Sequence, residues 1–344
     1  MSEFRVNSIT NQDGSAGPQV CGVSTFSGKS GVQIPSGPTE FRRLDGGGRG
    51  RGVFSGGRNN PVFYSNLSLV EIATKGNATD FGNMSRTVNG GSGNISSSIR
   101  GITSGGYDNV ASDNATHIDY FNFASSGGSN DFGELTEASN SHGGYSNGRR
   151  GIFSMGYPTY SGQLTFITIA STGDATAFGS LTSPPTVADA GGINSPTRAI
   201  LHGLNNASGN IGMCEFVTFE TLGTSQDFGN LTVTRQAGSG CSSLTRGISQ
   251  GGLTPSLSDV IDFCTIATLG DFTDFGNLTV ARRSPGGCSS EVRGLCAAGT
   301  TPTNQNIIDF ITISTAGNSV DFGDLSYSAR NVKGNSDAHG GLVR

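Results

Sequence analysis

The sequence predicts an all-β protein: a six-bladed β-propeller preceded by an extended N-terminal arm. Three observations carry this prediction. The chain contains six copies of a repeat of about 48 residues, and a unit of that length must stack on its neighbours to bury its apolar face. Its apolar runs are short and rich in Ile, Val, Thr and Phe, which is typical of strands. No apolar stripe persists at the spacing of an α-helix.

Two series of residues mark the repeat. One is a Phe-Gly dipeptide, with phenylalanines at Phe81, Phe132, Phe178, Phe228, Phe275 and Phe322. The other is an arginine followed by a small and an apolar residue, at Arg51, Arg100, Arg150, Arg198, Arg246 and Arg293. The two series keep the same phase along the chain, so we interpret them as structural marks of one unit.

Each repeat is expected to form four short strands in a fixed order. A Gly-rich run comes first, then a run that begins at the marking arginine, then an apolar run such as "IDFITI", and last the run with the Phe-Gly dipeptide. Gly, Asn and Ser between the runs supply turns, because Gly reaches positive φ freely and Asn and Ser hydrogen-bond their own backbone. Four strands per unit are typical of a propeller blade, and burial on both faces accounts for the nearly unbroken apolar third run.

The motifs "RGISQGG", "IDFCTIATLG" and "FGNL" resemble the kelch repeat, with Phe where kelch repeats usually carry Trp. The resemblance covers residues 51–344 and implies a kelch-like propeller, a fold that hosts many unrelated activities. The chain contains no Trp, and "RAILHGL" and "RGIFSMG" lack the glycine pair, so it resembles a divergent member.

Both ends of the repeat region contribute to one blade in this prediction. The region begins at the second strand of a repeat, at Arg51, and ends with "NVKGNSDAHGG", which we interpret as a first strand. Joining them closes the ring and leaves no free sheet edge. Residues 51–344 then form the propeller, residues 46–50 a Gly-rich joint, and residues 1–45 an arm that lacks the apolar residues for its own core and gains order by docking on another subunit.

The six cysteines predict neither disulfides nor a metal site, because no Cys-x-x-Cys motif occurs. Cys241 and Cys288 lie five residues before their marking arginine. The other repeats hold Ile95, Tyr145, Ile193 and His339 at that position. We therefore expect an inward-facing, mostly apolar position, with thiols that behave as buried hydrophobic groups. No metal and no cofactor are predicted.

The recurring Asp-Phe-Gly triplet is predicted to be a turn-and-strand element. A kinase magnesium site would need one such triplet together with an HRD loop, whereas this chain has five triplets, at Asp80, Asp131, Asp227, Asp274 and Asp321. Two roles remain open for these aspartates and the marking arginines. They form ion pairs between strands or blades, or they form a ring of charge around the central channel.

Composition and motifs argue against several function classes. Charged residues make up 14% of the chain, the net charge is −5 and the sequence has no basic cluster, so nucleic-acid binding is not expected. Neither a secretion signal nor an apolar span of membrane length occurs. The four histidines occupy unrelated repeat positions and no G-x-S-x-G motif is found, so we predict that the protein is not an enzyme.

The segments after the marking-arginine runs differ in length and chemistry and should emerge together on one face. Four tyrosines fall in the first three segments, among Asn, Ser, Gly and Pro: Tyr64, Tyr107, Tyr157 and Tyr160. Tyrosine in such company is typical of binding surfaces, so these four are the candidate ligand-binding residues. The alternative is solvated turns with the tyrosines packed on blade edges.

The motifs "SITNQDGSAGP", "TFSGKSG" and "IPSGPTEFR", followed by these repeats, resemble virion structural proteins of tailed bacteriophages, in particular T4-like phages of cyanobacteria. The resemblance implies a non-enzymatic protein, oligomeric or in many copies, that is assembled into the virion in the host cytoplasm. Its arm would dock on other virion proteins. Its propeller would serve as a tail-fibre or tail-associated module that binds a host-surface glycan or protein, or as a head decoration. The alternative is a lectin or a carbohydrate-processing enzyme with a polar central pocket.

Overall fold

The computed structural model describes residues 50–89, 93–182, 192–203 and 212–342, together with a few short strands elsewhere. The chain divides into two compact units, Met1–Gly47 and Gly48–Arg344. In the first unit, β1 (Gln19–Val20), β2 (Val23–Thr25) and β3 (Val32–Gln33) form an antiparallel sheet. The rest of the expected arm, residues 1–45, lies outside the described residues, as does the joint 46–50 apart from Gly50.

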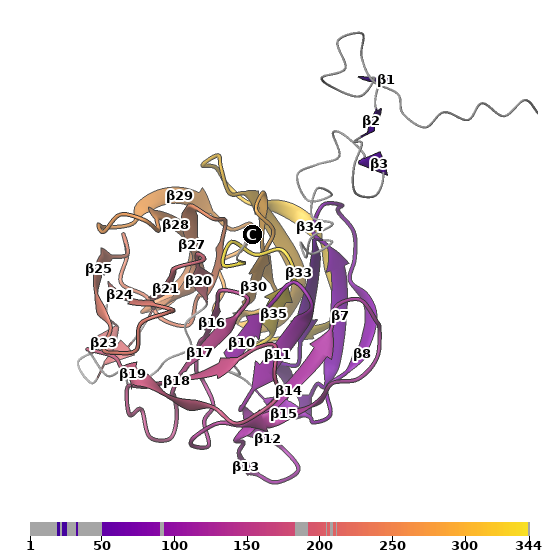
Figure 1. The fold of residues 1–344 in the computed structure, drawn as a ribbon. Helices are drawn as coiled ribbons and strands as arrows, with labels where there is room; N and C mark the ends of the chain where they lie inside the picture. The colour runs from indigo at the N-terminus through magenta and orange to yellow at the C-terminus, as the bar shows by residue number, and fades with distance from the viewer. Residues whose placement is uncertain are drawn as a thin grey trace, which may run out of the picture. The chain divides into compact units, whose positions relative to one another are not determined.

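The second unit is a six-bladed β-propeller, and the described residues contain no helix (Figure 1). This confirms the predicted all-β, six-bladed propeller. Each blade is an antiparallel sheet of four main strands, which we call first to fourth from the axis outward, and the blades are numbered I to VI along the chain.

The strands of the first three blades are the following. Blade I contains β35 (Lys333–Ser336), β4 (Arg51–Ser55), β7 (Asn66–Glu71) and β8 (Thr79–Asn83). Blade II contains β10 (Gly93–Ser96), β11 (Arg100–Ser104), β14 (His117–Asn122) and β15 (Asn130–Glu134). Blade III contains β16 (Gly144–Ser146), β17 (Arg150–Ser154), β18 (Gln163–Thr168) and β19 (Thr176–Ser180).

The remaining blades follow the same order. Blade IV contains β20 (Ile193–Asn194), β21 (Arg198–Leu201), β24 (Met213–Thr218) and β25 (Gln226–Asn230). Blade V contains β26 (Ser239–Ser242), β27 (Arg246–Thr254), β28 (Ser256–Thr265) and β29 (Thr273–Asn277). Blade VI contains β30 (Gly286–Ser289), β31 (Arg293–Ala297), β33 (Thr303–Thr312) and β34 (Val320–Ala329), with β32 (Thr300–Thr301) as a short addition to β33.

The ring closes where β35, near the C-terminus, pairs antiparallel with β4, near the start of the propeller. In this pairing Asn335 lies opposite Val53, as Cys241 lies opposite Ile248 in blade V. Asn335 therefore occupies the position that the sequence alignment gave to His339. The alignment was wrong because it assumed that β35 is followed by a hairpin, as the first strands of the other blades are. In blade I the following strand belongs to the other end of the chain, and its marking arginine is Arg51.

The Gly-rich first strands reflect how closely the blades approach at the axis. A Cβ at Gly287 would lie 2.5 Å from the carbonyl oxygen of Gly240, and one at Gly334 would lie 2.5 Å from that of Gly287. Real Cβ atoms do not approach so closely, so the first strands need glycine at these two positions. Blade II carries Asn94 at this position, and its amide nitrogen donates to the Oδ1 of Asn335, 2.6 Å away.

The Asp-Phe-Gly triplets join each blade to the next. In blade V, Ile261 pairs with Gly276 and Asp262 with Asp274, so Phe275 is the extra residue of a β-bulge. The bulge turns Phe275 into the core, where it is 3% exposed, and its carbonyl accepts a hydrogen bond of 2.7 Å from the amide of Gly317 in blade VI. An equivalent hydrogen bond joins each of the other pairs of neighbouring blades. The one between blades I and VI runs from the amide of Gly76 to the carbonyl of Phe322.

The triplet aspartates take neither of the two roles left open for them. They lie on the exposed outer strands, far from the axis, and none of the ion pairs between described residues includes them. A ring of charge around the channel would instead require side chains on the first strands, which line it. The triplet is therefore structural mainly through its backbone and its phenylalanine.

The marking arginines also connect neighbouring blades, but through carbonyl groups and aromatic rings. The guanidinium of Arg246 lies 4.7 Å from the ring centre of Phe263 and donates to the carbonyl of Ile313 in blade VI, 3.1 Å away. Equivalent contacts with an aromatic ring occur for Arg100, Arg150, Arg198 and Arg293. Arg51 has Leu69 at the ring position and pairs instead with Glu71, at 3.3 Å. The expected ion pair thus occurs at one marking arginine, with a partner the sequence did not indicate.

The apolar side chains form clusters between adjacent blades, and the cysteines belong to them. Among the described residues five cysteines are buried and free: Cys214, Cys241, Cys264, Cys288 and Cys296. Cys241 and Cys288 are 3% and 5% exposed, as expected for small hydrophobic groups. Within the part of the chain described here, no helix is long and apolar enough to cross a membrane.

Candidate functional site

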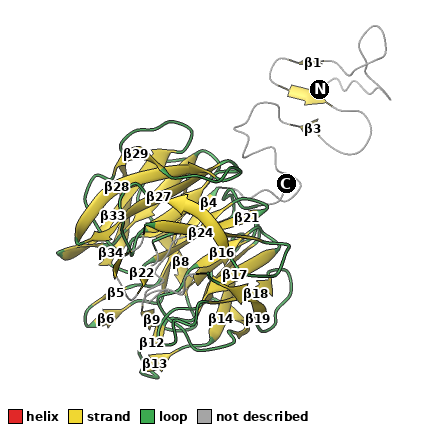
Figure 2. Ribbon diagram, turned by 90° about the vertical axis from the view of Figure 1, so that its left-hand side faces the viewer, coloured by secondary structure: helices red, strands yellow, loops and turns green. Residues whose placement is uncertain are grey.

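The loops between second and third strands and the connections between blades lie on the same face of the propeller. This follows from chain direction, because in an antiparallel blade the end of the second strand lies beside the start of the third and the start of the first. We call this side the loop face. Its short strands β5 (Arg58–Asn59), β6 (Val62–Phe63), β9 (Val88–Asn89), β12 (Tyr107–Asp108) and β13 (Asp113–Asn114) lie together along one side of the propeller in Figure 2.

The loops on this face are held by backbone hydrogen bonds to the connection that precedes each blade. Tyr157 pairs with Asn140, Leu253 pairs with Gln236, and β12 pairs with β9. Loops fixed in this way lose less conformational entropy when a partner binds, which favours recognition.

The candidate tyrosines lie in different surroundings. Tyr64 is half-buried, and its ring lies 4.4 Å from that of Tyr327, whose hydroxyl donates to the carbonyl of Gly56 at 3.0 Å. Tyr107 is half-buried in β12, between Asn89 and Asn114 of the flanking strands. These two are packed against the blades, which is the alternative that the sequence left open.

Tyr157 and Tyr160 form an aromatic pair in blade III. Their rings meet edge to face with centres 5.8 Å apart, and Tyr157 is 47% exposed. The amide of Tyr160 donates to the carbonyl of Gly156 at 2.8 Å, which fixes the turn between them. Of the four tyrosines, the structure therefore brings these two together at the surface.

Two valines that the sequence analysis passed over extend this surface. Val62 in blade I is 50% exposed and Val110 in blade II is 86% exposed, each in the loop between the second and third strands. With Tyr157, they give three consecutive blades one exposed apolar side chain each on the loop face. The sequence signal was available, because each follows a turn-forming pair, Asn60-Pro61 or Asp108-Asn109.

The central channel is too small for a sugar. It holds two cavities of about 50 Å³ and 30 Å³, both lined by the glycines of the first strands. The larger is also lined by hydroxyl groups such as those of Ser96 and Ser242, and by His339, whose Nε2 lies 3.1 Å from the carbonyl of Ser96. Space of this size holds a few water molecules, whereas ligand pockets commonly measure about 300–1,000 Å³.

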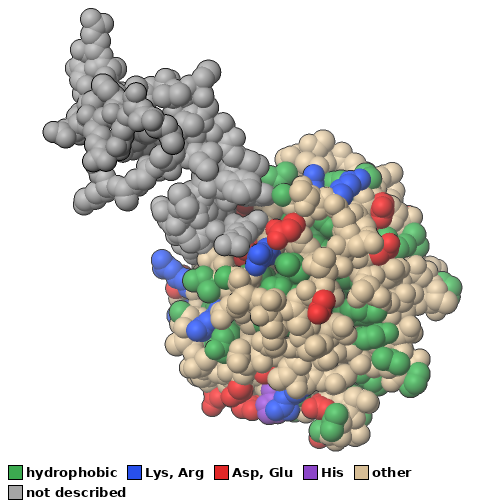
Figure 3. Space-filling model, turned by 90° about the vertical axis from the view of Figure 1, so that its right-hand side faces the viewer, with side chains coloured by type: hydrophobic (Ala, Val, Ile, Leu, Met, Phe, Trp, Pro, Cys, Tyr) green, Lys and Arg blue, Asp and Glu red, His purple; other side chains and the backbone are tan. Residues whose placement is uncertain are grey.

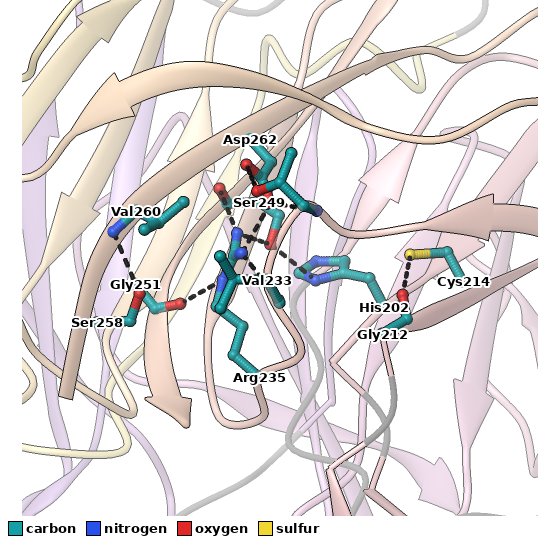
Figure 4. A network of polar contacts seen from close by, with 11 residues as sticks. His202, Gly212, Cys214, Val233, Arg235, Ser249, Gly251, Ser258, Val260 and Asp262 are labelled. Atoms are coloured by element: carbon teal, nitrogen blue, oxygen red, sulfur yellow. Dashed lines mark hydrogen bonds and ion pairs between the residues drawn. The ribbon is translucent and has the colours of Figure 1, made fainter. Parts of the chain in front are cut away.

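A buried polar network at blades IV and V was also missed (Figure 4). The Nη1 of Arg235 lies 2.7 Å from the Oδ2 of Asp262, with the two side chains 1% and 0% exposed. The Nη2 of Arg235 also contacts the Oγ of Ser249 at 3.1 Å, and this hydroxyl lies 3.1 Å from the Nδ1 of His202. The signal was an acidic residue inside the apolar third run, which recurs in blade VI, where Arg282 pairs with Asp309 at 2.8 Å.

This network is closed to solvent, so it has no access to a substrate, and we assign it to the interior of the fold. Within the described ranges, no group of three or more His, Cys, Asp or Glu side chains could hold a metal ion. No family model matches the chain, and no similar curated protein was found. We take the loop face over blades I to III as the candidate site, because it carries the exposed tyrosine pair and the exposed valines.

Proposed function

We propose that this chain is a non-enzymatic structural protein of a virion, and that its propeller uses the loop face to bind a partner on the host surface. The observation that carries the binding part is the row of exposed apolar side chains, Val62, Val110 and Tyr157, on backbone-fixed loops of three consecutive blades. Exposed aromatic residues such as Tyr157 are enriched among the residues that contribute most to binding energy at interaction sites.

The virion part rests on the sequence resemblance, with residues 1–45 as the attachment arm and assembly in the host cytoplasm. The propeller geometry supports a display role, since interblade hydrogen bonds and the shared blade make one closed ring that holds the loops in place. The small channel cavities count against the alternative of a lectin or enzyme with a central sugar pocket.

The test replaces Tyr157 and Tyr160 together by Ala in the full chain and measures adsorption of the purified protein to host cells. Each aromatic anchor contributes about 2 kcal/mol at a hot spot, so adsorption affinity should fall about 30-fold or more. Folding should be unaffected, because such surface changes alter stability by less than about 0.5 kcal/mol.

The matched control is Leu269→Ala, which removes an exposed apolar side chain from the opposite face, in the turn between β28 and β29. It should leave adsorption unchanged. Normal adsorption of the folded tyrosine variant would refute the loop face as the binding site. Incorporation into particles of a chain lacking residues 1–45 would refute the arm as the attachment segment.

A further inference from the structure

The chain crosses the central channel after its last strand, β35. The residues that follow, 338–342, are all buried, and we call them the C-terminal segment. The Nε2 of His339 lies 3.1 Å from the carbonyl oxygen of Ser96 in blade II. The amide of Gly340 donates to the carbonyl of Ser242 in blade V at 3.0 Å. Blades II and V lie opposite each other in a ring of six, so two consecutive residues span the channel.

The C-terminal segment closes the channel on the face opposite the loop face, which we call the turn face. Ser96 and Ser242 are the last residues of the first strands β10 and β26, and first strands run from the loop face to the turn face. A Cβ at Gly341 would lie 2.1 Å from the carbonyl oxygen of Ser146 in blade III and 2.8 Å from the Cβ of Asn194 in blade IV. The segment therefore fits the end of the channel as a plug, with glycine where neighbouring blades leave no room for a side chain.

The larger channel cavity, of about 50 Å³, lies against this plug. His339 lines the cavity together with Cys241 and Cys288. The smaller cavity lies toward the loop face, where Pro285 and Lys333 at the starts of first strands border it. Displacement of the C-terminal segment would therefore connect the larger cavity and its two thiols with solvent on the turn face.

His339 holds the plug in place with both ring nitrogens. Its Nδ1 accepts a hydrogen bond of 3.1 Å from the amide of Gly341, so this nitrogen carries no proton. The proton of the neutral ring is then on Nε2, which donates to the carbonyl of Ser96. The Oγ of Ser146 lies 3.4 Å from the same Nε2. The neutral imidazole thus joins the segment to itself and to blades II and III.

A second proton on the ring would break this arrangement. Protonated Nδ1 is a donor and would face the donating amide of Gly341, so that hydrogen bond would be lost. The charged ring would also stay 7% exposed in the closed plug, whereas water could solvate it in an open segment. Histidine gains this proton in mildly acidic solution, so the open population should rise as pH falls.

Most groups that face the imidazole carry no charge. Burial raises the pKa of the thiols of Cys241 and Cys288, so both stay neutral in acid. The side chains at the ends of the first strands are hydroxyl and amide groups: Ser96, Ser146, Asn194, Ser242, Ser289 and Ser336. Charged side chains on the outer surface are sparse and of both signs, as the side drawn in Figure 3 shows, so they add little field at the axis.

The charged groups beside the segment do not reverse the expected direction. Asp337 lies two residues before His339 in the chain, so its carboxylate stays close to the imidazole in both the closed and the open state. Glu291 accepts a hydrogen bond of 3.0 Å from the amide of Leu244 in the hairpin of blade V. The guanidinium of Arg51 is directed to the third strand of its own blade, where it forms an ion pair. The contact that protonation removes is therefore the one within the plug.

We propose that residues 338–342 form a plug that opens as one unit when His339 is protonated and so exposes the channel cavity on the turn face while the propeller stays folded. The blades keep their own closure, because β35 pairs with β4 ahead of the segment. The hydrogen bonds of Asp337 to the amides of Gly50 and Arg51 also precede it. The fold thus contains a pH-sensitive gate at one end of its channel.

The test measures hydrogen exchange at the amide of Gly340 in the full chain at about pH 7.5 and about pH 5, corrected for the intrinsic exchange rate at each pH. In the wild type, protection should fall about tenfold at the lower pH, which is the order of factor that one buried hydrogen bond contributes to an equilibrium. The amides of β26, which lies beside the segment, should keep their protection at both pH values.

Three variants separate the proton from the side chain. His339→Asn keeps an acceptor for the amide two residues later, as in an Asx turn, and does not titrate, so Gly340 should be protected equally at both pH values. His339→Ala removes the acceptor, so protection should be low at both. The matched control, His117→Asn, makes the same substitution at a half-buried histidine of blade II and should behave like the wild type.

Thiol labelling at about pH 5 provides a second measurement, with 4,4′-dithiodipyridine as a reagent that reacts in acid. Cys241 and Cys288 line the cavity and should be labelled about tenfold faster in the wild type than in His339→Asn. Cys214 and Cys264 belong to the cluster between blades IV and V and should stay unlabelled in both proteins.

The possible results distinguish a local plug from general acid unfolding. Protection lost together at Gly340 and throughout β26 would overturn the plug as a separate unit. Equal protection of Gly340 at both pH values in the wild type would overturn the gate. The same loss in His339→Asn as in the wild type would overturn His339 as the group that operates it. Equally slow labelling of the cavity thiols in both proteins would count against opening of the cavity.

Discussion

Replacing Asp337 by Ala should open the propeller at the blade shared by the two ends of the chain. In blade V the Oγ of Ser243 accepts hydrogen bonds from the amides of Thr245 and Arg246, at 3.4 Å and 3.1 Å, and so organises the hairpin between the first two strands. Blade I has no hairpin at this place. There Oδ1 of Asp337 accepts hydrogen bonds from the amides of Gly50 and Arg51, at 3.0 Å and 2.8 Å, and holds the same turn geometry between two separate chain segments.

The magnitude follows from burial. Asp337 is 2% exposed, so its removal leaves two amides without their acceptor in a place that water reaches poorly. Each unsatisfied buried donor costs about 1–3 kcal/mol, which gives a loss of about 2–6 kcal/mol. Because single domains are stable by only about 5–15 kcal/mol, this loss should clearly lower the urea concentration at the unfolding midpoint. The m-value from the same titration reports how much surface unfolding exposes.

The controls separate this hydrogen-bonding role from a general effect of the substitution. Asp337→Ser and Asp337→Asn introduce the side chains that perform the same task in the other blades, at Ser243 and Asn147, and should recover most of the loss. In the Asp337→Ala variant, the amides of β35 should exchange hydrogen faster than those of the first strand of blade V. The reasoning would be refuted if Asp337→Ala unfolded at the wild-type urea concentration, or if the Ser variant were no better than the Ala variant.

Two further predictions concern buried groups. Asp309→Ala should lower the free energy of unfolding by about 3–5 kcal/mol, because it leaves the charge of Arg282 buried without its partner. Asp309→Leu combined with Arg282→Met should recover most of that loss in the same urea titration. Equal stability of the single and double variants would contradict this. Burial raises the pKa of all five described thiols, so iodoacetamide should scarcely modify the native protein at neutral pH. The folded state holds the thiol protons more tightly than the unfolded chain, so the contribution of the thiols to stability should be constant below the unfolded pKa of 9.0 and be lost as pH rises from there through about 12, the value for Cys264. A thiol contribution that grows over that range would disprove the assignment.

The blade count could be predicted from the sequence because each blade repeats the same packing problem. Phe275 and its counterparts are buried through a bulge, and the glycines after them meet the backbone of the next blade, so both residue types are required in every copy. The two series of marking residues therefore reveal the number of blades. They do not reveal the partners, since Arg246 contacts the carbonyl of Ile313, which lies in another repeat. A pairing of the arginines with the triplet aspartates was a reasonable expectation from charge alone, and it was wrong.

The closing strand shows a different limit. Repeat phase alone assigned His339 to the inward position, but the residue opposite Val53 is Asn335. The error arose because the spacing between a first-strand residue and its marking arginine was taken from blades whose first two strands are joined by a hairpin. In the shared blade no hairpin joins these strands, and the side chain of Asp337 connects them by hydrogen bonds. His339 instead lies beyond the strand, beside the channel cavity and close to the carbonyl of Ser96.

The candidate site was predictable only in part, because tertiary contacts decide which of the loop residues are exposed. Composition singled out four tyrosines, yet only Tyr157 and Tyr160 meet at the surface, because Tyr64 packs against the half-buried ring of Tyr327. Charge counting found no basic cluster, yet Arg58 and Arg330 lie directly opposite each other, since β5 pairs with a segment from the other end of the chain. Both differences come from neighbouring blades, which supply the partners that decide whether a loop residue is packed or exposed. In a closed propeller, blades VI and I are neighbours in space although they are the most distant in sequence, so the junction between them is where the sequence is least informative about which residues meet.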